Sequence, residues 1–100
     1  MPLLFHHYSY FTRSLKSLGP EHVVIVQRIL IAIEAYYASN NQLTDAQKIE
    51  PRFFYKQLRK PYYEAGVEGK IRIIIERKKS DCFAVLAGDH DEIRRFLASQ

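Results

Sequence analysis

The apolar residues change their spacing halfway along the chain, and this change limits the folds that are possible. Between residues 9 and 38 they recur every three or four positions, which is typical of helices with one buried face. After Pro51 they alternate with polar residues, which is typical of strands with one buried face. Helices in one half and strands in the other predict an α+β fold, in which a helical hairpin packs on a sheet.

A short strand and a first helix are predicted at the start. Residues 3–8 are apolar and aromatic, so they are interpreted as a strand. Ser9 is then placed to cap a helix, because its hydroxyl can accept a backbone N–H of the first turn. Phe11, Leu15 and Leu18 recur on one face of that helix.

A second helix is predicted over about residues 20–38. Gly19-Pro20 separates it from the first, since glycine allows a left-handed end and proline presets the first turn of the next helix. Its wide apolar stripe must lie against a sheet, which is the only large partner that the rest of the chain can provide. Residues 39–51 are polar and are expected to form a connector.

Four strands and a terminal helix are predicted after the connector. The strands are expected at residues 53–56, 62–67, 70–76 and 82–87. Turn residues at 68–69 and 79–81 indicate antiparallel hairpins. The residues after 88–91 have the apolar spacing of a short helix. The predicted order is therefore β-α-α-β-β-β-β-α with a twisted, mainly antiparallel sheet.

The strand predicted over residues 70–76 has the clearest alternation of the chain. The isoleucines at positions 71, 73 and 75 point to one face. The opposite face takes Arg72, Ile74 and Glu76. Arg72 is therefore expected on the solvent-facing side of an otherwise isoleucine-rich strand.

The positive charge is confined to the second half of the chain. The net charge is +4, with four basic and four acidic side chains in residues 1–50 and eleven basic against seven acidic ones in residues 51–100. Such a field attracts polyanions, and with 13 aromatic residues nucleic acid is the natural candidate. A solvated basic surface that only aids solubility explains the composition equally well.

Length and composition exclude several classes of protein. One hundred residues fit a single domain, residues 1–100, whose function is expected on a groove or a face rather than in a large cavity. The single cysteine, Cys82, cannot form an internal disulfide and lacks the clustered histidines of a zinc site. We therefore expect no metal or cofactor. We also expect no membrane partner and a cytoplasmic location, because no apolar stretch is long enough for a signal peptide or a membrane-spanning helix.

Four motifs in this order resemble the RelE/ParE superfamily of bacterial toxins over nearly the whole chain. They are Phe11-Thr-Arg-Ser-Leu-Lys-Ser-Leu18, Leu58-Arg59-Lys60-Pro61-Tyr62-Tyr63-Glu64, Lys70-Ile-Arg-Ile-Ile-Ile75 and Leu86-Ala-Gly-Asp-His-Asp-Glu-Ile93. The resemblance implies a toxin of a type II toxin–antitoxin pair, whose cognate antitoxin covers the basic groove. Members of the RelE branch cleave mRNA, usually on the ribosome, whereas the ParE branch poisons DNA gyrase.

Metal-free cleavage of RNA sets requirements that the candidate residues can be compared with. The ribose 2′-OH attacks the adjacent phosphate, so a base, an acid and cations for the developing charge are needed. The resemblance places Arg72 where the family's strand arginine contacts the scissile phosphate. It places His90 where the family carries an arginine or histidine, and it makes Glu64 a candidate base.

Each of these three residues also has a structural interpretation. Arg72 can pair across the hairpin with Glu64 or Glu76. His90 can cap the terminal helix or bond to a loop. Glu64 can pair across the strands with Lys70 or Arg72.

A second group of residues is expected to bind the substrate. Cations would hold the phosphates, and a terminal aromatic would stack on a base, as the resemblance implies. The alternative interpretations are surface charges for the cations and core packing for the aromatic. These residues are Lys56, Arg59, Lys60, Lys70, Arg94, Arg95 and Phe96.

The sequence departs from the family at one strand. The usual Glu-x-Arg is Glu64-Ala65-Gly66 here, and the lysines of some RelE-like members are replaced by Tyr63 and Ala65. A nuclease with this sequence would depend on a histidine-centred set. A gyrase-directed toxin without catalysis, and a basic nucleic-acid-binding module without chemistry, stay open as alternatives.

Overall fold

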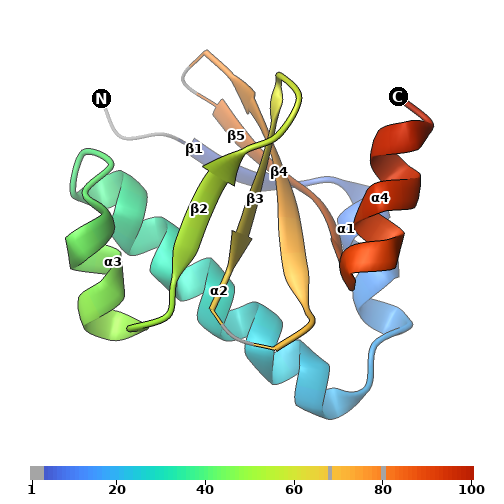
Figure 1. Cartoon of the computed structure of the whole chain (residues 1–100), viewed down its shortest axis with the longest axis horizontal. Coiled ribbons are helices and arrows are strands. Elements are labelled where there is room, and N and C mark those ends of the chain that lie inside the picture. Colours follow the sequence, from blue (N-terminus) through green and yellow to red (C-terminus); the bar gives the residue numbers. More distant parts are fainter. Residues whose placement is uncertain (1–3, 68, 80) are drawn as a thin grey trace.

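Five strands and four helices make up the computed structural model, which describes residues 4–67, 69–79 and 81–100, with only the backbone for residues 4–7. Figure 1 shows their arrangement. In chain order they are β1 (Leu4–His7), α1 (Ser9–Lys16), α2 (Pro20–Ala38), α3 (Leu43–Ile49), β2 (Phe54–Gln57), β3 (Tyr62–Gly66), β4 (Arg72–Lys78), β5 (Asp81–Gly88) and α4 (His90–Ala98).

The strands form one sheet in the order β1-β5-β4-β3-β2. Neighbouring strands are antiparallel except that β1 runs parallel to β5. The predicted α+β class and the mainly antiparallel sheet are therefore confirmed. Figure 1 shows α2 crossing one face of this sheet, while α4 lies beside β4 and β5 on the other.

The alternation predicted for β4 is present, and it separates the two faces of the sheet. Ile73 and Ile75 are fully buried in the main core, where they join Ile29 and Ile33 of α2. Ile74 faces the other way and belongs to a smaller cluster beneath α4. Each face of the sheet therefore has its own apolar layer, because a strand turns successive side chains to opposite sides.

A β-bulge in β5 widens the cluster beneath α4. Ile74 pairs with Leu86 but Ile75 pairs with Ala84, so Val85 is the extra residue of β5. Val85 and Leu86, although adjacent, both pack in the smaller cluster with Ile74. A bulge of this kind re-aims side chains locally.

The first helix differs in detail from its prediction. Tyr8, not Ser9, occupies the position before the first helical residue, and no side-chain capping bond forms there. The predicted left-handed end of this helix at Gly19 is wrong, because α1 already ends at Lys16 and Gly19 is extended, with φ −69°. The predicted start of the next helix is confirmed, since Pro20 is the first residue of α2. Proline is tolerated there since the first N–H groups of a helix lack internal partners.

The predicted connector contains a helix that sequence periodicity did not indicate. Within residues 39–51, α3 packs on α2 through Ala46, which is fully buried. The polar sequence of α3 supplies a single buried position, too few for a recognisable stripe. The predicted turns have positive φ at Gly69 and Lys79, while Glu68 and Ser80 lie outside the described residues.

Candidate functional site

A cavity of about 420 Å³ lies where β4 and α4 begin. We call it the β4–α4 pocket. Two of the predicted catalytic residues, Arg72 and His90, both line it, although 18 positions separate them in the sequence (90 − 72). Its lining residues are Gly69, Lys70, Arg72, Asp89, His90 and Asp91.

The Arg72 side chain is held in one orientation by two kinds of contact. Its guanidinium lies 4.9 Å from the centre of the Phe54 ring, in a cation–π contact. Its Nη1 donates to the carbonyl oxygens of Gly69 and Ile71, at 2.5 and 3.1 Å. Gly66 leaves space for this arrangement, since a Cβ there would lie 2.7 Å from Arg72 Cδ. About a quarter of the Arg72 side chain stays exposed, so an anion can still reach it.

Glu64 is buried between two cations of neighbouring strands. Its Oε1 lies 3.4 Å from Lys56 Nζ, and its Oε2 lies 3.7 Å from Arg72 Nε. Only 5% of the Glu64 side chain is exposed, and the residue does not line the β4–α4 pocket. The cross-strand pairing expected with Arg72 is thus present, and the second partner is Lys56 rather than Lys70. A buried carboxylate with two cationic partners is placed to orient Arg72.

His90 is the first residue of α4, and its side chain is exposed. Asp89 caps the helix in its place, because the Asp89 carboxylate accepts the backbone N–H of Glu92 at 2.9 Å. Glu92 completes a capping box by accepting the Asp89 N–H at 3.1 Å. The interpretation of His90 as the helix cap is therefore wrong, and its imidazole is available at the pocket.

The other predicted cations lie in different places. Lys70 lines the β4–α4 pocket with Arg72. Arg59 and Lys60 lie in the β2–β3 connection at the opposite end of α4, where Arg59 donates to the Leu97 carbonyl oxygen at 2.5 Å.

Arg94 and Arg95 are both exposed on α4. Arg95 lines a separate cavity of about 190 Å³, which also includes Tyr10 and Phe96. Arg94 lines neither this cavity nor the β4–α4 pocket. The second group of predicted residues therefore does not meet at one point.

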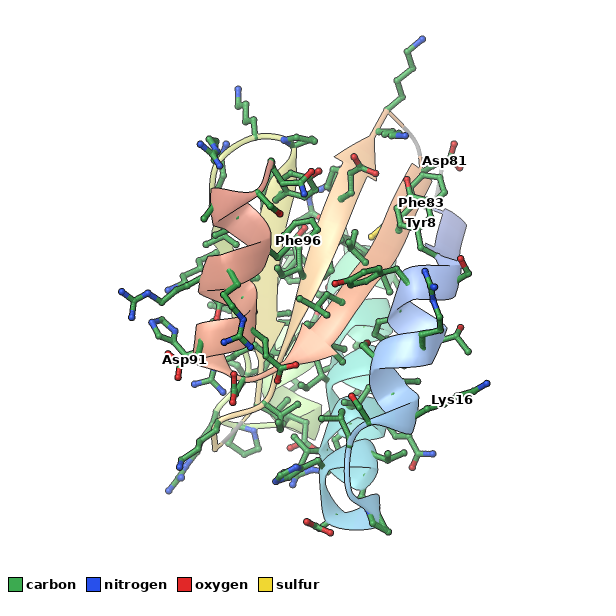
Figure 2. The ribbon with its side chains drawn as sticks, turned by 90° about the vertical axis from the view of Figure 1, so that its right-hand side faces the viewer. Tyr8, Lys16, Asp81, Phe83, Asp91 and Phe96 are labelled. Carbon is green, nitrogen blue, oxygen red and sulfur yellow. The ribbon has the colours of Figure 1, made fainter. Side chains whose placement is uncertain are left out.

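A second cavity, of about 440 Å³, was not predicted from the sequence. We call it the α1–α4 groove. Figure 2 shows Phe96 of α4 on one side of it and Tyr8, next to Phe83, on the other. The half-buried Phe96 packs on the smaller apolar cluster and also lines this groove, so it combines the two roles considered for it. The groove is lined by Tyr8, Tyr10, Tyr62, Glu76, Lys78, Val85, Phe96, Ser99 and Gln100.

Cys82 belongs to the main core, on the face of the sheet that α2 covers, and it lines neither cavity. It is fully buried, and its Sγ lies 3.4 Å from the Tyr37 hydroxyl. Burial raises the pKa of this thiol to about 11, which keeps it protonated and unreactive at neutral pH. Among the described residues no group of His, Cys, Asp and Glu side chains is arranged to hold a metal ion.

No helix in the described part of the chain is both long and apolar enough to cross a bilayer.

Comparisons with known proteins identify the fold. No family model matches the sequence, and no curated protein matches it. Among solved structures, a chain of the RelB–RelE antitoxin–toxin complex of Methanococcus jannaschii is similar with a TM-score of 0.60 and 22% identity, over 94% of this chain and 98% of that one. A copper-bound mutant toxin of Helicobacter pylori is similar with a TM-score of 0.55 and 16% identity, over 91% of this chain and 98% of that one. The chain has the fold of RelE-like toxins.

Proposed function

We propose that this protein, as one domain over residues 1–100, is the toxin of a type II toxin–antitoxin pair and cleaves mRNA without a metal ion. The observation that carries the proposal is that Arg72 and His90 line one cavity on the surface. An exposed imidazole and an anchored guanidinium that line one cavity can provide proton transfer and charge stabilisation to the same substrate.

The proposed reaction is an attack of the ribose 2′-oxygen on the adjacent phosphorus. The P–O5′ bond breaks, which gives a 2′,3′-cyclic phosphate and a free 5′-hydroxyl. His90 takes the proton of the 2′-hydroxyl and returns a proton to the leaving 5′-oxygen. Arg72 stabilises the negative charge of the phosphorane-like transition state, and Lys70 adds to the positive field.

We assign Glu64 a positioning role instead of the role of base. Its carboxylate contacts Arg72 and Lys56 and lies away from the pocket lining. Loss of this carboxylate is expected to slow cleavage through the position of Arg72. Glu64→Gln, which keeps the shape and a hydrogen-bond acceptor, should retain more activity than Glu64→Ala.

The partners follow from the same proposal. One of the solved structures similar to this chain is an antitoxin–toxin complex. We propose a cognate antitoxin that covers the basic surface and shields α4, and mRNA, free or on the ribosome, as substrate.

The test is incubation of purified protein with mRNA in EDTA, with and without programmed ribosomes. Wild type is expected to cut the RNA, and Arg72→Ala and His90→Ala to slow the cuts at least tenfold, or about 1.4 kcal/mol of transition-state stabilisation. Arg52→Ala serves as the matched control, because Arg52 is exposed in the α3–β2 turn, away from the pocket. Intact RNA together with stalled gyrase would favour a gyrase-directed toxin, which the residues Tyr63 and Ala65 in place of strand lysines already suggest. Salt-sensitive RNA binding without product would favour a binding module.

A further inference from the structure

The α1–α4 groove contains a carboxylate and an ammonium group side by side. Glu76 and Lys78 come from alternate positions of β4, so both point to the α4 side of the sheet. Lys78 Nζ lies 3.7 Å from Glu76 Oε1. The Tyr8 hydroxyl donates to the same Oε1 at 2.5 Å. Within the described residues both contacts use Oε1, so Oε2 keeps its capacity to accept hydrogen bonds from a ligand.

Aromatic rings line the groove on both sides, and each packs on a second ring. Tyr8 stacks on Phe83 with ring centres 4.8 Å apart and planes within 9°. On the α4 side, Phe96 meets Tyr62 edge-to-face, with ring centres 5.2 Å apart. Tyr8 and Phe96 line the cavity, whereas Phe83 does not, so Phe83 supports Tyr8 from outside the groove. Rings fixed in this way are ready-made surfaces for stacking a planar base.

We propose that the α1–α4 groove binds one guanine base of single-stranded RNA. The Watson–Crick edge of guanine presents the acceptor O6 next to two donors, N1–H and N2–H. The Lys78 ammonium can donate to O6, while the Glu76 carboxylate accepts from N1–H and N2–H, which gives charge-assisted hydrogen bonds on the whole edge. Tyr8 and Phe96 supply the stacking surfaces.

The same pair of charges disfavours the other three bases. Adenine and cytosine present an amino donor where guanine has O6, and an unprotonated ring nitrogen where guanine has N1–H. Their amino group would face the ammonium, and the ring nitrogen would face the carboxylate, so both contacts become unfavourable. Uracil offers one N–H between two carbonyl oxygens and a smaller ring for stacking.

The groove and the β4–α4 pocket lie toward opposite ends of α4. His90 at the start of α4 lines the pocket, and Ser99 just beyond its end lines the groove. The nine residues of α4 span about 13 Å at roughly 1.5 Å per residue. The guanine would therefore flank the scissile nucleotide. The inference rests on the proposed function for its substrate class, single-stranded RNA, and adds a base preference to it.

Binding is tested with hexanucleotides that cannot be cleaved, because each ribose carries a 2′-O-methyl group. The probes are UUGUUU, UUAUUU, UUCUUU and UUUUUU with a fluorescent end label, and fluorescence anisotropy gives their dissociation constants. We expect UUGUUU to bind wild type at least tenfold more tightly than the other three. Equal affinities for the four probes, as expected if the groove takes a partner polypeptide instead, would overturn the inference.

Variants locate the preference in the groove. Glu76→Gln and Lys78→Met are expected to bring UUGUUU to the affinity of UUAUUU. Glu34→Gln and Lys16→Met are the matched controls, because both residues are exposed and line neither cavity, and they should keep the tenfold preference. A thermal melt of each variant identifies any that fails to fold. A guanine preference that survives both groove substitutions in folded protein would place recognition elsewhere and overturn the assignment.

The two proposals can fail separately. Because the probes lack a 2′-hydroxyl, the guanine preference is measured without any chemistry. A protein that prefers guanine but leaves mRNA intact contradicts only the nuclease proposal. A protein that cuts mRNA through Arg72 and His90 but binds the four probes equally contradicts only the inference on guanine.

Discussion

The Arg72 guanidinium can lie where it does only because residue 66 is a glycine, since there is no space for a side chain at residue 66. A Cβ on Gly66 would approach Phe54 Cε1 to 2.6 Å and Arg72 Cδ to 2.7 Å. We predict that Gly66→Ala displaces the guanidinium, slows RNA cleavage at least tenfold and lowers the free energy of unfolding by about 1–3 kcal/mol, as overpacking usually does. Cleavage rates and urea unfolding measure the two effects.

Gly19→Ala is the matched control for this substitution. A Cβ there meets only the flexible end of Glu21, which can move away, and Gly19 lines neither cavity. If Gly66→Ala cleaves RNA at the wild-type rate, Arg72 does not need its present position.

Cys82 makes the stability depend on alkaline pH. Burial raises the pKa of its thiol from 9.0 to about 11 in the folded chain. The unfolded chain therefore loses this proton first, so stability is complete below pH 9 and falls as the pH rises toward 11, by on the order of 3 kcal/mol. We predict that Cys82→Ala flattens this part of the pH profile, measured by urea unfolding at several pH values between 8 and 11. An unchanged slope in Cys82→Ala would show that the thiol is not responsible.

At the scale of elements, the capping box of α4 fixes the first turn of this helix, which lines the β4–α4 pocket. Asp89 and Glu92 satisfy each other's backbone N–H groups, and His90 lies between them in the first turn. We predict that Asp89→Ala costs about 1 kcal/mol of stability and also slows cleavage, because the first turn of α4 loosens around His90.

Asp91→Ala is the comparison for the capping prediction. Asp91 is exposed in the same turn but makes no capping bond, so its loss should cost only a few tenths of a kcal/mol through the helix dipole. Equal losses of stability in the two variants, measured by chemical unfolding, would contradict the assigned role of the cap.

The elements differ in how far the sequence predicts them. The strand β4 could be predicted because its residues 72–76 turn alternately to the two faces of the sheet. A period of two is typical of a strand. The helix α3 could not, because only Ala46 of its seven residues is buried. Arg72 and His90 were recognised through the order of the motifs, while the anchoring contact with Phe54 depends on the register between β2, β3 and β4.

At the scale of the whole molecule, the α1–α4 groove depends on how the two chain halves meet. The parallel pairing of β1 with β5 brings Tyr8 to Glu76, 68 positions away in the sequence. No local pattern contains this contact, because it is set by the position of β1 at the sheet edge. The groove is thus a property of the topology, and it became visible only in the folded chain.

The basic second half predicts how RNA binding responds to salt. Each phosphate contact releases counterions, so the logarithm of the affinity falls linearly with the logarithm of the salt concentration. We predict that Lys70→Met reduces this slope by about one for the 2′-O-methyl probes, because Lys70 lines the β4–α4 pocket. Lys16→Met on the exposed side of α1 should leave the slope unchanged. A slope that Lys70→Met does not alter would remove Lys70 from the phosphate-binding surface.

The central claim is that Arg72 and His90 act on the same phosphodiester. A double-mutant cycle tests it most directly, with cleavage of one RNA in EDTA measured for Arg72→Ala, His90→Ala and the double variant, and with the product ends identified. We predict 2′,3′-cyclic phosphate ends, at least a tenfold loss for each single variant, and a double variant slower by less than the product of the two losses, because residues that act together are not additive. A wild-type rate in either single variant would contradict the claim.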